Sequence, residues 1–573
     1  MHFTGGALVA RALADEGISL TFGIPGTHNI ELYDALAESE VVRPVLVTDE
    51  QSASFMADGY WRASGRLACV NVVPGAGLTH ALSGIAEAFM DNIPMLVLGC
   101  GIRRDIPKAY QLHDIDQLAV VRPVTKAAFR VERGEDLYPE IRRACALARG
   151  GAPGPVMVEV PVNLYLHQYE VPEGGFQAPP RSAIPTGADA LAAVAALLND
   201  AAARPFLYVG LGAARAAAEL LLLAERLEAP VATTFQGKGV FPESHPLFLW
   251  NGFGAASPPF ARAVAGGRRV TLAVGCRFSE VGTGSYGLEP PGPLIHVDID
   301  PGVPGRNYPV QQAVTADAAA FIGGLLPLVT QRPTDAALRR AIASGHEGVW
   351  KEWRSQQSER VTPARLLRDV QDAFGPETIF TTDSGNGTFL AMECLRLERS
   401  GKFLAPVDYS CMGYAVPAAI GAKLARPECP VVALAGDGAL LMTGLELLTA
   451  AQENLGLAVL VLRDRELGQI SQFQATALNR KTASELADYD AGGIAAALGV
   501  EALSLERDGD IPAILRRVRE ITGAGRPVLV DVAIDYSRRT YFTAGVVKTN
   551  LLRLPWRDRL RFIGRALKRR IFG

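Results

Sequence analysis

The fold of this chain is decided by the stretch VVALAGDGALLMTGLELLTAAQENLGLAVLVLRDRELGQ, residues 431–469. An apolar run over 431–435 ends at a Gly-Asp-Gly tripeptide, 436–438, and a second apolar run covers 457–462. Between the two runs, residues 441–454 have the apolar spacing of a helix. A strand, a helix and a strand in this order predict a right-handed βαβ unit, in which the two strands are parallel neighbours.

Two carboxylates follow these strands. Asp437 comes directly after the first strand and Asp464 after the second, 27 positions later. Parallel neighbours end at the same sheet edge, so we expect the two side chains to converge where the helix N-terminus offers N–H groups to a phosphate. Such oxygen ligands suit Mg²⁺. Two surface turns are the alternative, because Asp and Gly are common turn residues, but the pairing across one βαβ unit favours a metal–phosphate site.

Length and charge restrict the class of protein. A chain of 573 residues needs several cores. With 57 basic and 60 acidic residues it lacks the positive field of a nucleic-acid binder, and we expect no nucleic-acid partner. Seven cysteines without a CxxC pair predict reduced thiols. No apolar window reaches the roughly 18 residues of a membrane span, and Asp15 and Glu16 interrupt the N-terminal segment, so we expect a cytoplasmic enzyme without a signal peptide.

Strand and helix patterns alternate along most of the chain, as in parallel sheets covered by helices on both faces. A Pro- and Gly-rich stretch, 171–189, predicts a linker, and a charged stretch, 330–363, predicts a solvated helical connector. The expected fold is therefore α/β, with three doubly wound parallel-sheet domains over 1–170, 190–330 and 360–540, followed by a tail over 541–573.

The Gly-Asp-Gly stretch resembles the signature of the thiamine-diphosphate (ThDP) enzymes, which runs from GDG through a βαβ unit to a pair of asparagines. Here Arg463-Asp464 replaces that pair, and Asp464 stands where the second asparagine binds the metal. The resemblance implies a Mg²⁺ ion held by Asp437, Asp464 and the backbone carbonyl of Glu466. It covers about 1–540, implies pyrimidine-binding, central and diphosphate-binding domains in that order, and is closest to the acetolactate (acetohydroxyacid) synthase branch.

A second motif, RPVLVTDEQSASFMADGYWRASG over 43–65, is similar to the family's RHEQ…MADGYAR segment. The resemblance implies that Glu50 is the acid that drives the cofactor's aminopyrimidine into its imino form. Asp49 replaces the histidine of that motif. A solvated carboxylate at a helix start is the alternative for an isolated Glu, and the surrounding match favours the catalytic role.

Two further segments match the family's cofactor-binding loops: TTDSGNGTFL over 381–390 and DYSCMGYAVPAAIGAKLA over 408–425. The resemblance implies that Met412 wedges between the two cofactor rings and that the Ser410 carbonyl accepts from the aminopyrimidine amine. Without it, this Met would be read as core filler. The full set of expected cofactor-binding residues is Gly385, Asn386, Gly387, Ser410, Met412, Gly436, Gly438, Ala439 and Gly468.

The substrate pocket departs from the synthases. Gln469 and Phe473 stand where those enzymes place a methionine and a tryptophan over the acceptor. His28 follows Gly26 and Thr27 in a turn where the synthases prefer small residues, and it serves there either as a proton shuttle or as a structural histidine. Gln111 falls where the family has a substrate-side glutamine.

The resemblance implies a ThDP- and Mg²⁺-dependent 2-oxo acid decarboxylase/carboligase that forms a hydroxyethyl-ThDP-like intermediate, with pyruvate as default donor. A non-ligating decarboxylase, a benzaldehyde-lyase-like carboligase and a pyruvate-oxidase-like flavoprotein stay open as alternatives. Because Glu50 and Gln111 of one family subunit face the diphosphate site of another, the resemblance also implies a homodimer at least, with a homotetramer as the expected assembly.

The middle block is similar to the FAD-binding region of acetolactate synthases, which would place Gly210, Gly212, Arg277 and Asp298 against the flavin. Relatives keep this fold without flavin, so binding of FAD stays open.

The last residues have a pattern of their own. After Pro555, apolar residues recur at helical spacing, and basic residues surround them. This predicts a basic amphipathic helix that either docks on its own subunit or lies peripherally on an anionic membrane. The apolar positions are Trp556, Leu560, Ile563, Leu567 and Ile571, and the basic ones are Arg553, Arg557, Arg559, Arg561, Arg565, Lys568, Arg569 and Arg570.

Overall fold

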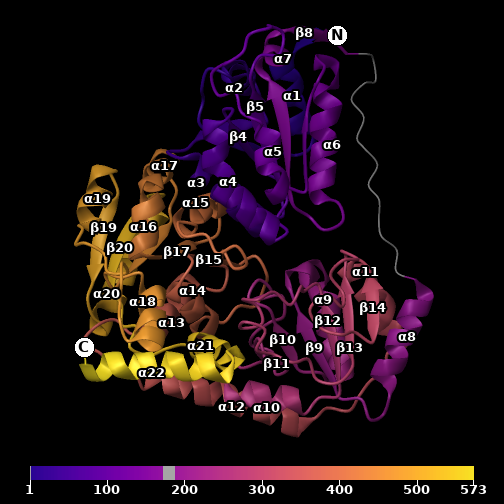
Figure 1. Cartoon of the computed structure of the whole chain (residues 1–573), viewed down its shortest axis with the longest axis vertical. Coiled ribbons are helices and arrows are strands. Elements are labelled where there is room, and N and C mark those ends of the chain that lie inside the picture. Colours follow the sequence, from indigo (N-terminus) through magenta and orange to yellow (C-terminus); the bar gives the residue numbers. More distant parts are fainter. Residues whose placement is uncertain (1, 172–186, 573) are drawn as a thin grey trace.

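The computed structural model describes residues 2–171 and 187–572. Most of the linker predicted at 171–189 lies outside the described residues. Three lobes each surround a parallel six-stranded sheet (Figure 1), which confirms the predicted three-sheet α/β fold. No helix within the described ranges is long and apolar enough to cross a membrane.

The first sheet has the order β3-β2-β4-β5-β7-β6. A separate two-stranded antiparallel sheet is formed by β1 and β8. The strands are β1 (His2–Thr4), β2 (Leu20–Gly23), β3 (Arg43–Leu46), β4 (Cys69–Val72), β5 (Met95–Gly101), β6 (Ala127–Arg130), β7 (Pro155–Pro161) and β8 (Gln168–Glu170). The helices are α1 (Gly5–Asp15), α2 (Ile30–Ala37), α3 (Glu50–Ser64), α4 (Ala76–Met90), α5 (Gln117–Val121), α6 (Leu137–Arg149) and α7 (Val162–Leu166).

The central sheet, β11-β10-β9-β12-β13-β14, has the order of a classical dinucleotide-binding fold, in which the direction of winding reverses between the first and fourth strands along the chain. Its strands are β9 (Pro205–Val209), β10 (Val231–Thr233), β11 (Phe248–Asn251), β12 (Val270–Val274), β13 (Leu294–Asp298) and β14 (Gln312–Thr315). The helices are α8 (Ala188–Asn199), α9 (Ala217–Leu227), α10 (Pro259–Gly266) and α11 (Ala318–Leu325).

The third sheet, β16-β15-β17-β18-β20-β19, repeats the strand order of the first, so the two lobes share one plan. Its strands are β15 (Ile379–Thr382), β16 (Phe403–Leu404), β17 (Val431–Gly436), β18 (Ala458–Arg463), β19 (Glu501–Leu505) and β20 (Val528–Ala533). The helices are α13 (Pro363–Phe374), α14 (Asn386–Cys394), α15 (Ala415–Ala425), α16 (Asp437–Thr443), α17 (Leu447–Gln452), α18 (Gly468–Leu478), α19 (Ala491–Ala497) and α20 (Ile511–Gly523).

The βαβ unit predicted from 431–469 is present, with β17 and β18 parallel neighbours. Its crossover differs from the expected single helix over 441–454. It begins earlier, at Asp437, and a 3-10 turn over Gly444–Glu446 divides it into α16 and α17. A glycine inside a helix has low helix propensity, so Gly444 is a physical reason for the interruption.

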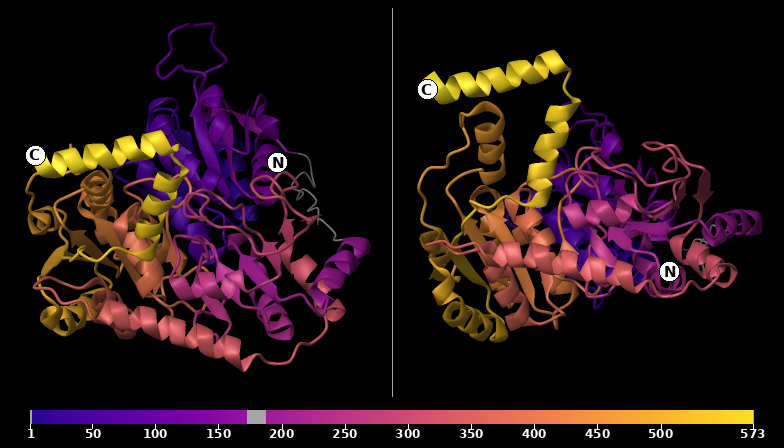
Figure 2. Two further views of the ribbon diagram at one scale, coloured as in Figure 1. Left: turned by 60° about the horizontal axis from the view of Figure 1, so that its bottom comes forward. Right: turned by 90° about the horizontal axis from the view of Figure 1, so that it is seen from below.

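The connector predicted at 330–363 contains α12 (Ala336–Arg354). This helix is not solvated on all sides, because Leu338, Ile342, Val349 and Trp353 are buried on one face. Beyond the third sheet, α21 (Tyr541–Arg553) and α22 (Trp556–Phe572) end the chain. Figure 2 shows α22, in yellow, along the outside of the molecule.

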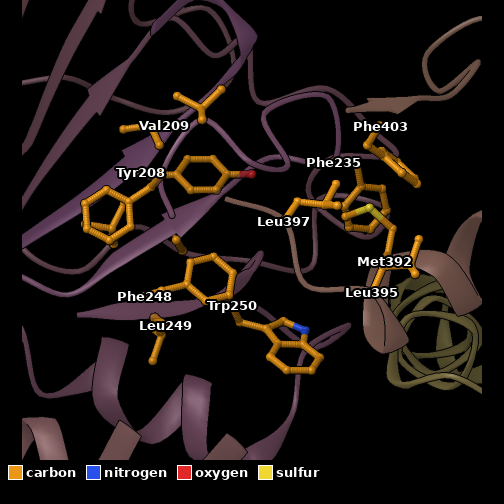
Figure 3. Packing of buried hydrophobic residues seen from close by; sticks show 14 of the residues in the cluster. Tyr208, Val209, Phe235, Phe248, Leu249, Trp250, Met392, Leu395, Leu397 and Phe403 are labelled. Carbon is orange, nitrogen blue, oxygen red and sulfur yellow. The ribbon is translucent and has the colours of Figure 1, made fainter. Parts of the chain in front are cut away.

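Close packing joins the lobes. Between the first and third, α3 lies against α15 so closely that a Cβ at Gly421 would be 2.0 Å from the Met56 carbonyl oxygen. Between the central and third lobes, one hydrophobic cluster contains Tyr208, Phe235 and Trp250 from one side and Met392 and Leu395 from the other (Figure 3). The third lobe is therefore held against both neighbours by buried apolar surface.

Candidate active site

Asp437 is the first residue of α16, at the end of β17, and it is 1% exposed. Its Oδ2 accepts hydrogen bonds of 2.8 Å from the backbone amides of both Asp464 and Arg465, and its Oδ1 accepts from the hydroxyl of Tyr489. The end of β18 is thus fixed beside the start of α16, and the two carboxylates meet at the same sheet edge, as the spacing predicts.

Asp464 lies in an environment that disfavours its charge. Burial chiefly, with the negative charge of Asp437 adding to it, raises the pKa of Asp464 to about 7. The amide of Glu466 donates to Asp464 Oδ1 at 3.2 Å, so the backbone turns tightly around this carboxylate. A buried and a half-buried carboxylate side by side call for a cation, and their oxygens are the ligands that Mg²⁺ prefers.

Glycines leave space beside these carboxylates. A Cβ at Gly468 would lie 2.3 Å from Asp464 Oδ2 and 3.2 Å from Asn386 Nδ2, and that amide nitrogen is buried without a hydrogen-bond partner. Gly385, before it, has φ of 133°, a conformation that favours glycine. We call Gly385, Asn386 and Gly468 the glycine cradle. Its free space and unpaired amide donor fit a bound anion such as a diphosphate.

The segment around Met412 approaches the same place. A Cβ at Gly438 would lie 3.0 Å from Met412 Cε. Ser410 has a left-handed φ of 63°, and its hydroxyl is 2.8 Å from that of Ser384. Asp383 holds the segment, because its carboxylate accepts from the amides of Gly413 and Ala415 at 2.9 and 2.8 Å.

The residues expected to form the substrate pocket and to bind the cofactor lie in two lobes, the first and the third. Gln469 and Phe473 lie on α18, directly after Gly468. Gly387 is on α14, Gly436 caps α16, and Ala439 is buried within α16. All of these belong to the third lobe, whereas Glu50, Gly26, Thr27, His28 and Gln111 belong to the first.

Glu50 begins α3 and is 7% exposed. Its loop is fastened to the third lobe by Glu446. The Oε1 of Glu446 accepts from the Thr48 amide at 2.9 Å, the Thr48 hydroxyl at 2.6 Å and the Asp49 amide at 3.1 Å. Burial raises the pKa of Glu446. A buried carboxylate with several donors is a strong anchor, so the crossover of the βαβ unit also positions the acid of the first lobe.

Near His28, the Gly26 amide donates to Asn29 at 2.7 Å, and the Thr27 hydroxyl is 3.2 Å from His28 Nδ1. The rings of His28 and His113 are 5.4 Å apart, edge to face. Burial chiefly, and the proximity of His113, lower the pKa of His28, which favours its neutral form. Gln111 is turned toward its own loop, because its amide donates to the backbone oxygens of Arg103 and Lys108.

A cavity of about 1020 Å³ lies between the central lobe and the first, and three of the four residues expected near a flavin line it: Gly212, Arg277 and Asp298. The fourth, Gly210, is not one of its lining residues. Gly212 is needed there, because a Cβ would lie 2.8 Å from the Cα of Gly275. Arg277 pairs with Asp408 at 2.7 Å, and burial raises the pKa of Asp298 to about 6.

Comparison with known proteins agrees with this geometry. Three family models match, described as the N-terminal TPP binding, central and C-terminal TPP binding domains of thiamine pyrophosphate enzymes, over residues 3–120, 191–325 and 383–532. The acetolactate synthase of Mycobacterium bovis is 30% identical over 557 residues, which cover 93% of this chain and 88% of the relative. The chain belongs to the thiamine pyrophosphate enzyme family.

Other similar members include the acetolactate synthase isozyme 3 large subunit of Escherichia coli K12, 30% identical with 94% of this chain and 96% of the relative covered. A probable acetolactate synthase large subunit of Methanocaldococcus jannaschii is 30% identical, with 93% and 92% covered. This thiamine pyrophosphate enzyme is thus acetolactate synthase-like, and its two TPP-binding regions contain the Glu50 and Asp437 groups respectively.

Three residues of the site were missed from the sequence. Asp383 lies inside the quoted loop 381–390, but its role as the anchor of Gly413 depends on a contact between loops. Glu446 stands in the middle of the crossover, and Tyr489 lies 52 positions after the Asp437 it contacts. Neither has a local sequence signal.

Proposed function

We propose that this thiamine pyrophosphate enzyme is a Mg²⁺-dependent 2-oxo acid decarboxylase/carboligase of acetolactate synthase type, with pyruvate as the default donor. The observation that carries the proposal is the pair of carboxylates formed by buried Asp437 and half-buried Asp464, beside a glycine cradle with an unpaired Asn386 amide. We retain 1–170, 190–330 and 360–540 as the pyrimidine-binding, central and diphosphate-binding domains.

Each group of residues has one task. Asp437, Asp464 and the Glu466 carbonyl would hold Mg²⁺, and the cradle, with Gly438, would receive the diphosphate. When bound there, ThDP would supply a carbon nucleophile and an electron sink for the decarboxylation of a 2-oxo acid.

The first lobe supplies the proton chemistry. Glu50 would hold a proton for the aminopyrimidine ring, and Met412 and the Ser410 carbonyl would orient that ring. Neutral His28, with Gly26 and Thr27 beside it, exchanges a proton with the substrate. Gln111 would donate its amide to the substrate after turning away from the backbone oxygens of Arg103 and Lys108. Gln469 and Phe473 form the acceptor side, where an amide adds a hydrogen bond and a phenyl ring leaves more room than an indole.

The experiment is a screen of 2-oxo acids for CO2 release by the protein loaded with Mg²⁺ and ThDP, with products identified by NMR. Release of CO2 together with acetolactate or acetoin from pyruvate supports a carboligase. Release with the free aldehyde alone supports the non-ligating alternative, and aldehyde coupling without CO2 supports a benzaldehyde-lyase-like enzyme. No turnover of any 2-oxo acid overturns the proposal.

We further propose a homodimer as the smallest active unit, and a homotetramer as its assembly. Exposed apolar side chains favour this, because they lie around both halves of the site and large exposed patches mark interfaces. Leu441, Met442 and Leu445 surround the crossover, at 48%, 52% and 60% exposed, and Ile30 and Leu46 lie in the first lobe, at 57% and 52%.

Mixing two inactive variants tests the shared site. If Glu50 of one chain serves the Asp437 of its partner, exchange of Glu50→Ala and Asp437→Ala subunits restores one site in each mixed dimer, about a quarter of full activity at random pairing. Sites built within single chains would stay inactive after mixing. Light scattering distinguishes dimer from tetramer.

A second candidate is a flavoprotein that passes electrons from the 2-oxo acid to an acceptor, favoured by the cavity lined by Gly212, Arg277 and Asp298. A yellow purified protein whose visible absorption is bleached by pyruvate supports it. A colourless protein that does not take up FAD leaves the cavity without a flavin role.

We also propose that α22 associates peripherally with anionic membranes. The helix contacts α18, but its apolar stripe stays largely exposed: Trp556 is 65% exposed, Leu560 59% and Ile571 69%. An exposed apolar stripe between cations fits an anionic bilayer surface. Co-sedimentation with anionic liposomes should be strong for the full chain and lost for a chain ending at Thr549, which keeps the buried Phe542 and Thr543. Equal binding by both chains contradicts this.

A further inference from the structure

Three titratable side chains meet at the start of α3. The Nδ1 of His80 lies 3.4 Å from Glu50 Oε2 and 3.6 Å from Asp49 Oδ1. Within 2–171 and 187–572, His80 is the one basic side chain at ion-pair distance from Glu50. The His80 side chain is 65% exposed and that of Glu50 is 9% exposed. The imidazole therefore spans the space between solvent and the buried acid.

Two packed helices hold this contact. His80 is on α4, which packs against α3. A Cβ at Gly77 would lie 2.9 Å from Glu50 Oε1, so the missing side chain lets the carboxyl group rest against the first turn of α4. His80 follows three positions later, on the same face of the helix. The helix thus presents a gap for one carboxyl oxygen and a ring nitrogen for the other.

Asp49 has two partners. It is the N-cap of α3, where its Oδ1 accepts from the Gln51 amide at 3.2 Å, and the same oxygen faces His80. This is the position at which the RHEQ motif has a histidine. The imidazole near the acid now comes from the neighbouring helix, and the residue that replaced the motif's histidine is a carboxylate that can orient it.

We propose that His80 is a positioning residue for Glu50, and that Asp49 orients His80. The inference rests on the proposed function, because it gives Glu50 the role of activating acid. The His80 ring fixes the direction of the Glu50 carboxyl group and connects it to solvent. When Glu50 gives its proton to Nδ1, the exposed Nε2 releases one to water, and the reverse transfer reloads the acid.

Exchange of the C2 proton of ThDP for deuterium tests this without any knowledge of the substrate. The full-length protein is loaded with Mg²⁺ and ThDP, transferred to D2O and quenched, and the C2–H signal is followed by NMR. His80→Ala should slow the exchange at least about tenfold, while the dissociation constant of Mg-ThDP stays within about twofold and the melting temperature of the cofactor-free protein is unchanged. Asp49→Asn, which retains a helix cap, should slow exchange less.

A double-mutant cycle separates this role from a structural one. Because His80 acts through Glu50, His80→Ala should have no further effect when Glu50 is already Gln. Thr79→Ala, on the same turn of α4, is the matched control and should exchange like the wild type.

Wild-type exchange by His80→Ala would overturn the inference, as would an equal loss in the Glu50→Gln background or a matching loss of cofactor affinity. A wild-type protein that does not accelerate exchange over free ThDP would overturn the proposed function itself, and the two failures are therefore distinguishable.

Discussion

The backbone amide of Asp464 donates a 2.8 Å hydrogen bond to Oδ2 of Asp437, across two neighbouring parallel strands. This contact fixes the buried carboxylate of Asp437 beside the half-buried one of Asp464 at one sheet edge, where a divalent cation would offset their repulsion. Asp437→Ala and Asp464→Ala should each weaken binding of ThDP in the presence of Mg²⁺ by at least about 100-fold, measured by calorimetry. Asp488→Asn, which alters an exposed carboxylate on Arg465, is the control. Binding of ThDP that does not depend on Mg²⁺, or on either carboxylate, would contradict the metal site.

Adding one methyl group at Gly468 tests whether the glycine cradle binds the cofactor. In Gly468→Ala the new Cβ would fall 2.3 Å from Asp464 Oδ2, so that carboxylate must turn away from its present position. We expect affinity for Mg-ThDP to fall about tenfold or more, because a displaced ligand loses its geometry. Gly509→Ala, where a Cβ would meet nothing within 4 Å, is the matched control. Equal affinities of the two variants would show that the cradle does not receive the cofactor.

Glu446, itself buried, links the first and third lobes by three part-buried hydrogen bonds. Glu446→Ala leaves the Thr48 amide, its hydroxyl and the Asp49 amide without an acceptor, and should lower the free energy of unfolding by about 3 kcal/mol. Urea denaturation provides the measurement. Glu453→Gln, which removes an ion pair with half-exposed Arg43 between the same two lobes, should cost less than about 1 kcal/mol. Similar losses in both variants would contradict an anchoring role for Glu446.

Glu393 should make the free energy of unfolding of the protein depend on pH. Burial raises its pKa to about 8, although its Oε1 accepts from the Phe542 amide. Because the folded pKa lies above the unfolded one, the stability associated with this carboxyl is present below the unfolded value of 4.5 and is lost as pH rises through about 8. Glu393→Gln mimics the neutral form. The variant should match the wild type near pH 5 and exceed it by at least about 2 kcal/mol at pH 8. A difference that does not change with pH would show that Glu393 is charged in the fold.

Secondary structure and strand pairing could be predicted from the sequence where they depend on residues close together in the chain. The apolar runs before Asp437 and Asp464 predict parallel neighbours because a βαβ unit has one favoured hand. The spacing from Trp556 onward likewise predicts α22. Neither pattern shows what a helix faces: the stripe of α22 is exposed, whereas that of α12 is buried.

Tertiary contacts determined the rest. The hydrogen bonds from Gly413 and Ala415 to Asp383 join segments 30 or more positions apart in the sequence. The hydrogen bond from Thr48 to Glu446 joins residues 398 positions apart. The meeting of His80 with Asp49 and Glu50 depends on how α4 packs on α3. No periodicity or motif in one segment contains that information, so these partners became visible only in the fold.

Release of CO2 from pyruvate labelled at its carboxyl carbon tests the central claim most directly. The wild-type protein with Mg²⁺ and ThDP should release labelled CO2. Glu50→Ala should still bind the cofactor, as calorimetry would show, but release CO2 at least about 100-fold more slowly, because the acid that activates the ring is gone. CO2 release by Glu50→Ala at the wild-type rate would contradict the account. So would a loss of CO2 release that is explained entirely by loss of cofactor binding.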